Sequence, residues 1–179
     1  MRKTIRKWFW MWDFDKEEQW LNEMAAKGLA LVGVGFCRYD FEESTPGEYN
    51  VRLEMLKNTI IHPESQNYIG FLEDTGAEHI GTLLRWVYFR KKAEGGSFDL
   101  FSDIDSRIKH LDRMMIFPII AFFANFINAI NMTHQYSLGI YGTLFPALIT
   151  WAISILLAYG FGCLLIKRHQ LKKKRLLHE

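Results

Sequence analysis

The distribution of charged residues divides the chain into a mixed N-terminal part and a long apolar C-terminal part. No Asp, Glu, Lys or Arg occurs from Met114 to Ile166. Within this stretch, two apolar runs, 114–132 and 143–166, flank the polar, glycine-containing segment 133–142. At 1.5 Å per residue the runs would reach about 28 and 36 Å, so each can cross a hydrocarbon core of about 30 Å. The pattern therefore predicts two transmembrane helices joined by a short external loop.

The N-terminal part alternates between strand-like and helix-like patterns. Residues that favour strands gather at 3–12, 29–41, 49–55 and 80–92. Apolar residues recur at helical spacing in 13–27 and 64–74, and Gly28 and Gly76 follow these two helices. The order β-α-β-β-α-β predicts an α+β fold. We expect a ferredoxin-like sandwich, in which two helices cover one face of a four-stranded antiparallel sheet.

A linker and a connector helix are predicted between this head and the first span. Residues 93–97, Ala-Glu-Gly-Gly-Ser, are typical of a flexible linker, and Ser102 with Asp105 is typical of a helix cap. The predicted organisation is listed from N- to C-terminus as follows. It comprises a cytoplasmic ferredoxin-like domain (1–97), a juxtamembrane connector helix (98–113), the first span (114–132), an external loop (133–142), the second span (143–166) and a basic cytoplasmic tail (167–179).

Basic residues near the predicted spans indicate their orientation. The chain has 22 basic and 20 acidic residues, and the 13-residue segment 167–179 alone holds six of the basic ones. Arg107, Lys109 and Arg113 precede the first span, whereas the loop between the spans has no Lys or Arg. Because basic flanks stay on the cytoplasmic side, we expect a two-pass protein of the cell membrane with both termini in the cytoplasm.

The basic tail favours an anionic-lipid anchor over a nucleic-acid patch, because it directly follows a membrane span. The residues assigned to this anchor are Lys172, Lys173, Lys174 and Arg175. The membrane is therefore a predicted partner, and no direct contact with nucleic acid is expected.

The spans themselves carry two sets of residues suited to helix packing. Asn125, Asn128 and Asn131 recur every three residues, and Ala158 with Gly162 forms a small-xxx-small pair. The amides are suited to hydrogen bonds with Thr150 and Ser154 of the other span, or with a second copy of the chain. A conduction or binding path lined by the three amides is the alternative.

Catalytic and metal-binding motifs are missing from the sequence. The six histidines show no H-x-x-x-H spacing, and the two cysteines, Cys37 and Cys163, fall in different predicted parts of the chain. No phosphate-binding loop and no G-x-S-x-G motif occurs. We therefore expect no enzymatic activity, no metal and no cofactor.

Aromatic residues in the predicted strands suggest a binding surface instead. Trp8 and Trp10 fall on one side of the first strand, and Trp86 and Tyr88 share a side of the last. The face without helices would expose one of these sets to a protein partner or a second copy, unless the connector helix folds back over it. The sequence thus predicts a membrane-anchored regulatory or adaptor protein. The alternative is an accessory subunit or small-molecule sensor of a membrane complex.

Several segments of the head together resemble the bacterial family of unknown function numbered 2812. These segments are residues 14–28, 46–49, 52–54, 86–90 and 98–106, which include Gln19-Trp-Leu-Asn22 and Trp86-Val-Tyr-Phe-Arg90. The resemblance covers roughly 3–113. It implies a cytoplasmic head joined to membrane spans, often encoded beside a PadR-type transcriptional regulator, and it implies no activity.

Overall fold

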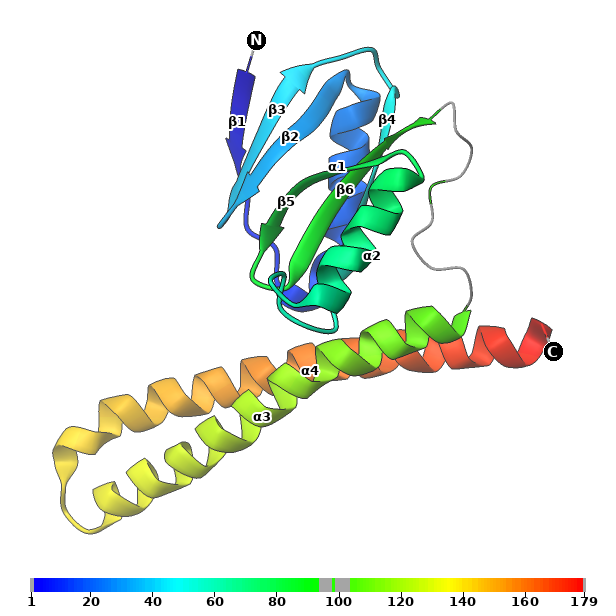
Figure 1. Cartoon of the computed structure of the whole chain (residues 1–179). Coiled ribbons are helices and arrows are strands. Elements are labelled where there is room, and N and C mark those ends of the chain that lie inside the picture. The colour runs from blue at the N-terminus through cyan, green and yellow to red at the C-terminus, as the bar shows by residue number, and fades with distance from the viewer. Residues whose placement is uncertain (1, 94–97, 99–103, 179) are drawn as a thin grey trace. The chain divides into compact units, whose positions relative to one another are not determined.

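The computed structural model describes residues 2–93, 98 and 104–178. The chain divides into two compact units, a head (Met1–Ser102) and a helical hairpin (Asp103–Glu179), both drawn in Figure 1. Apart from Ala93, the predicted linker 93–97 lies outside the described residues, as does the predicted Ser102 cap.

The head is a mixed α+β unit, as predicted, but it does not have the predicted ferredoxin-like order. Its elements are β1 (Arg2–Arg6), η1 (Met11–Asp13), α1 (Phe14–Ala26), β2 (Leu29–Gly35), β3 (Arg38–Glu43), β4 (Tyr49–Met55), α2 (Pro63–Asp74), β5 (Ala77–Leu83) and β6 (Trp86–Lys92). They form two antiparallel three-stranded sheets, β1-β3-β2 and β4-β6-β5, in place of one four-stranded sheet.

The difference arises because two predicted single strands, 29–41 and 80–92, are β-hairpins. The first turns at residues 36–37 and the second at 84–85. Cys37 (φ 53°) and Leu84 (φ 59°) adopt the left-handed conformation that tight hairpin turns require. Such turns usually contain Gly, Asn or Asp. Positions 36–37 and 84–85 contain none of these residues, so the sequence did not indicate a turn at either place.

The first predicted strand, 3–12, is also shorter than expected. β1 pairs only with β3, and the last pair in the register is Arg6 with Arg38. Arg38 is the first residue of β3, next to the turn at 36–37, so the residues after Arg6 have no partner strand in a ladder. They form an irregular segment that leads into η1, where the Asp13 amide donates to the Trp10 carbonyl at 2.8 Å.

The head consists of the same β-α-β-β unit twice. The first unit runs from β1 to β3 and the second from β4 to β6, with the helix placed between the first two strands of each. Gly28 and Gly76 both follow the helix with positive φ, and the register shifts before Gly33 in β2 and before Gly81 in β5. Gly28 and Gly76 are 48 residues apart in the sequence, and so are Gly33 and Gly81. The head is thus an internal structural repeat.

The two sheets meet along β2 and β5. A Cβ atom at Gly81 would lie 2.9 Å from Cγ2 of Val34, so this close approach requires glycine. The guanidinium of Arg90 donates to the Leu31 carbonyl at 2.8 Å and links β6 to β2.

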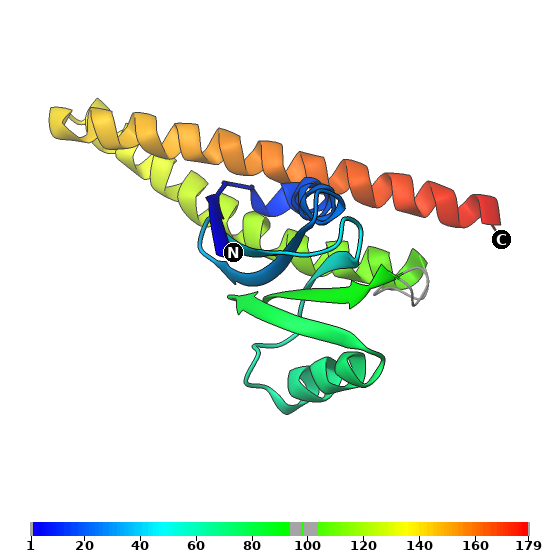
Figure 2. The same cartoon turned by 90° about the horizontal axis from the view of Figure 1, so that it is seen from above.

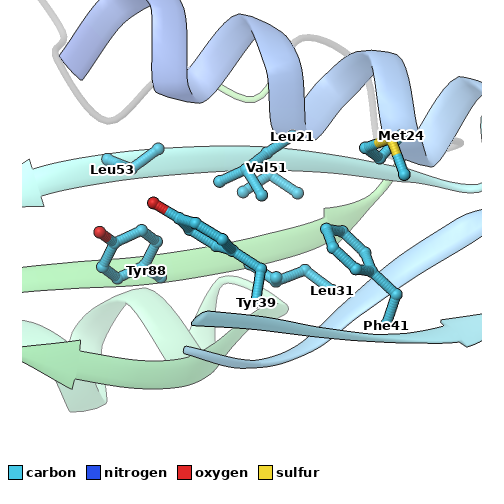
Figure 3. Close-up of a cluster of buried hydrophobic side chains, with 8 residues drawn as sticks. All are labelled: Leu21, Met24, Leu31, Tyr39, Phe41, Val51, Leu53 and Tyr88. Atoms are coloured by element: carbon cyan, nitrogen blue, oxygen red, sulfur yellow. The ribbon is translucent and has the colours of Figure 1, made fainter. Parts of the chain in front are cut away.

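Each helix of the head covers a separate core. α1 contributes Leu21 and Met24 to a cluster that includes residues of both sheets, shown in Figure 3. α2 packs through Ile69 and Leu72 on Val87 and Phe89 of β6. Tyr88 of β6 belongs to the α1 cluster, whereas its neighbours Val87 and Phe89 belong to the α2 cluster. Since successive residues of a strand point to opposite faces, α1 and α2 lie on opposite sides of β4-β6-β5, as Figure 2 shows.

The second unit is a helical hairpin. It comprises α3 (Ile104–Ser137), η3 (Tyr141–Thr143) and α4 (Leu144–His178). By length and composition, both helices could cross a membrane, which is compatible with a two-span membrane protein. α3 contains the described part of the predicted connector together with the first predicted span, and α4 continues through the second span into the tail.

Candidate interaction surface

A buried carboxylate joins the two repeats of the head. Glu17 on α1 is 8% exposed, and its Oε1 accepts 2.7 Å hydrogen bonds from the hydroxyls of Tyr39 on β3 and Tyr88 on β6. Burial raises the pKa of Glu17, and the two tyrosine hydrogen bonds oppose this rise. Burial, followed by the nearby carboxylate, raises the pKa of both tyrosine hydroxyls, which keeps them protonated as donors.

The four aromatic residues that the sequence suggested as partner-binding residues differ in their exposure to solvent. Tyr88 is only 3% exposed and its hydroxyl is used by Glu17, so it does not belong to an exposed surface. Trp86 is half-buried and packs against the core of α1. Trp8 and Trp10 are exposed.

The sheet face that lacks a helix is polar, contrary to the expectation of an aromatic face. On the outer side of β1-β3-β2, the Thr4 hydroxyl donates to Asp40 at 2.5 Å and Arg38 pairs with Asp40 at 3.0 Å. The neighbouring aromatic residues of β3, Tyr39 and Phe41, point into the core. The strand pattern therefore places its aromatic residues inside the head.

Exposed aromatic rings gather instead at one end of the first repeat. The ring of Trp8 meets those of Trp10 and Phe36 edge to face, with centroid distances of 5.3 and 5.7 Å. Trp10 also stacks on Trp12 at 5.1 Å. The Lys7 amide donates to the Cys37 carbonyl at 3.2 Å, which holds the irregular segment against the turn of the β2–β3 hairpin.

The second repeat builds the corresponding end in the same way. The Leu56 amide donates to the Arg85 carbonyl at 2.8 Å, and the guanidinium of Arg85 donates back to the carbonyls of Leu56 and Lys57. This loop and turn expose Ile61 and Leu84. Both repeats thus fix apolar side chains on hydrogen-bonded connections.

These four connections lie at one end of the head, which we call the aromatic end. It comprises residues 7–13, 36–37, 56–62 and 84–85, and the opposite end comprises 27–28, 44–48 and 75–76 (Figure 1). The described head residues that are large, apolar and exposed are Trp8 (52%), Trp10 (40%), Phe36 (74%), Ile61 (85%), Phe71 (63%) and Leu84 (87%). All except Phe71, which is on α2, belong to the aromatic end. Exposed apolar residues that gather in this way make this end a candidate interaction surface.

The aromatic end is also the basic end. With one flanking residue on each side, its connections hold Arg6, Lys7, Arg38, Lys57 and Arg85 against a single acidic residue, Asp13. Lys57 pairs with Glu64 of α2 at 3.2 Å. Adding the first turn of each helix brings in Asp15, Lys16, Glu17 and Glu64, and the sum remains positive. The opposite end, which also includes the start of β1 and the end of β6, holds Arg2, Lys27 and Lys92 against Glu43, Glu48 and Asp74, so it has no basic excess.

Three residues of this surface were missed by the sequence reasoning. Phe36 and Leu84 were assigned to the interior of long strands, and Ile61, between the predicted strand 49–55 and the predicted helix 64–74, was given no role. An apolar residue in a turn is usually exposed, because turns lie on the surface. This indication could be used only after the hairpin turns had been recognised.

The predicted packing residues of the hairpin occupy different environments. The Asn125 amide donates to the Thr150 carbonyl at 2.7 Å and to the Ser154 hydroxyl at 2.8 Å. Asn128 and Asn131 are exposed on the hairpin surface. Of the small-residue pair on α4, Ala158 is exposed and Gly162 is half-buried.

Ion pairs join the charged ends of the hairpin. Arg168 pairs with Asp112 at 2.5 Å and Arg175 with Asp105 at 2.9 Å. Arg175 is therefore engaged with α3, whereas the predicted lipid-anchoring residues Lys172, Lys173 and Lys174 are exposed on the last turns of α4.

Comparison with known proteins gives a family and no activity. In the described part of the chain, no group of three or more His, Cys, Asp or Glu side chains could hold a metal ion. No curated protein and no solved structure matches the chain. The model of the family described as "Protein of unknown function (DUF2812)" matches residues 13–123, from just before α1 into α3, which is more than half of the chain. The chain therefore belongs to the DUF2812 family.

Proposed function

We propose that this protein is a membrane-anchored regulatory or adaptor protein whose cytoplasmic head acts by binding through its aromatic end. The hairpin would anchor the chain in the cell membrane with both termini in the cytoplasm. Basic residues on the two flanks of the apolar helices, and none in the connection between them, support this orientation.

The observation that carries the proposal is the exposed cluster of Trp8, Trp10 and Phe36. Exposed Trp and Phe side chains bury a large area when they are covered, and residues of this kind dominate the energetics of interfaces. The cluster is held by backbone hydrogen bonds on a folded unit, so little conformational entropy is lost when a partner covers it.

Binding is favoured over catalysis by the state of Glu17, one of the buried acids of the head. Both hydrogen bonds to Glu17 come from side chains of the core, and the carboxylate joins the two repeats. We assign Glu17 a role in stability.

A second candidate function is that of an accessory subunit within a membrane complex. It is favoured by Asn128 and Asn131, whose amides lie exposed on an apolar helix. Polar side chains in that position hydrogen-bond well to another helix.

A photo-cross-linking amino acid distinguishes these candidates in living membranes. We would place it in the full chain at Phe36, at Asn128 and, as the matched control on the opposite end, at Thr45. We expect adducts at position 36 that disappear when Trp8 and Trp10 are both replaced by Ser. Adducts at 128 without any at 36 would favour the subunit, and equal yields at 36 and 45 would refute a binding surface at the aromatic end.

A further inference from the structure

The composition of the aromatic end has two components that occur together. Trp8, Trp10, Phe36, Ile61 and Leu84 provide exposed apolar surface, and basic side chains surround them. The connections at the opposite end contain neither a large exposed apolar residue nor a basic excess. The head is therefore polarised along its strands.

This pairing matches the chemistry of an anionic membrane surface. Trp residues are enriched where hydrocarbon meets headgroups, because the ring is largely apolar and its N–H can hydrogen-bond in the interface. Lys and Arg beside such residues are attracted to acidic headgroups. Apolar side chains on separate turns can insert side by side, since each turn is hydrogen-bonded to its neighbour.

The sequence between the head and the hairpin is long enough to allow this contact. Phe98 is held in the head, because it packs in the α2 core and its carbonyl accepts a 2.7 Å hydrogen bond from Arg52 of β4, so five residues, 99–103, separate it from the start of α3. Fully extended, the chain from 98 to 104 could span about 20 Å, whereas the three residues from Arg52 to the end of β4 span only about 10 Å. α3 begins ten residues before the apolar run that starts at Met114, which is about 15 Å of helix.

The tether also favours the membrane over other occupants. A head attached to its own membrane meets that surface at a high effective concentration, so modest insertion is sufficient for docking. A free protein partner has no such advantage.

Building on the proposed function, we infer that the occupant of the aromatic end is the anionic lipid surface of the membrane that anchors the chain. Trp8, Trp10, Phe36 and Leu84 insert at the level of the headgroups. Arg6, Lys7 and Arg38 contact the acidic headgroups. The head then has a docked and an undocked state, whose balance depends on the lipid charge.

Spin labelling of the full chain in lipid nanodiscs tests this inference. Cys37→Ser and Cys163→Ala remove the native thiols, and Leu84→Cys or Thr45→Cys then carries a nitroxide at the aromatic or the opposite end. Collision with oxygen, which is enriched in lipid, and with a nickel chelate, which remains in water, reports the depth of each label. The nanodiscs contain phosphatidylcholine with or without phosphatidylglycerol.

We expect the oxygen-to-nickel accessibility ratio at position 84 to rise several-fold when phosphatidylglycerol is present, while the ratio at position 45 remains that of a water-exposed label. Replacing Trp8 and Trp10 by Ser should abolish the rise. The matched control Phe71→Ser, which removes an exposed aromatic residue from α2, should leave it unchanged.

Three results would overturn lipid docking. The first is equal nickel accessibility at positions 84 and 45, and the second is a rise that needs neither phosphatidylglycerol nor the two tryptophans. The third is a label at 84 that is shielded from both reagents, because this indicates a protein cover. Cross-linking at Phe36 in cells separates the two proposals: protein adducts there would leave the binding surface standing after lipid docking had failed.

Discussion

The hydrogen bonds of Glu17 should make a measurable contribution to the stability of the head. Tyr88→Phe removes one of the two donors to the buried carboxylate and leaves the ring in place. A hydrogen bond to a charged group contributes about 1.5–3 kcal/mol, so we expect a loss of about 2 kcal/mol. Tyr39→Phe should have a similar effect, because its hydroxyl donates to the same oxygen.

Removing both donors should cost more than either change alone. A buried carboxylate that loses its partners retains the full cost of desolvation, and breaking buried charged pairs costs about 3–5 kcal/mol. The triple variant Glu17→Met, Tyr39→Phe, Tyr88→Phe is the matched control. It should recover much of the loss, because an apolar group of similar length replaces the charge.

Urea unfolding of the full chain in detergent micelles, followed by tryptophan fluorescence, measures these differences. Trp20 reports directly on this region, since its ring lies 5.0 Å from that of Tyr39. With a slope of about 1–3 kcal/mol per molar urea, a change of about 2 kcal/mol shifts the midpoint by about 1 M. A shift below about 0.3 M for both single variants would refute the role assigned to Glu17.

The pH dependence gives an independent check. The pKa of Glu17 is raised in the folded head, so the folded state holds this proton more tightly than the unfolded state. The head should therefore lose stability as pH rises from the unfolded pKa, near 4.5, through the raised folded pKa. Without the two tyrosine hydroxyls the folded pKa rises further. The cost of the double variant should accordingly grow with pH across that window, and a cost independent of pH would contradict the assignment.

Three further predictions concern the core, the hairpin and the topology. Leu21→Ala, at a fully buried position of α1, should destabilise the head by about 2–5 kcal/mol in the same urea assay, whereas Gln19→Ala on the exposed side should have little effect. Asn125→Ala should weaken the α3–α4 hairpin by about 1 kcal/mol in a micellar unfolding assay, and Asn128→Ala, which removes an exposed amide, should not. In a background without Cys37 and Cys163, a membrane-impermeant thiol reagent should label Ser137→Cys in intact cells and spare Lys173→Cys; the reverse pattern would invert the orientation.

The pattern of residues was sufficient to predict the elements whose signals are local. Two long apolar runs define the helices of the hairpin, because length and apolarity alone decide whether a helix can cross a bilayer. In the head, the glycines at 28 and 76 marked the ends of α1 and α2 correctly, since few other residues adopt positive φ after a helix.

The positions of the hairpin turns and the exposure of the aromatic residues depend on contacts between segments that are remote in sequence. The hairpin turns at Cys37 and Leu84 are specified by strand pairing on both sides, and pairing partners are remote in sequence. Tyr88 is buried because β6 is the central strand of a sheet with a helix on each face, so both sides of that strand lie inside the head. Trp8 is exposed because β3 begins at Arg38, opposite Arg6, and provides no pairing partner for the residues beyond Arg6. The exposure of an aromatic side chain depends on neighbours that the fold brings together, and the local pattern of residues does not contain them.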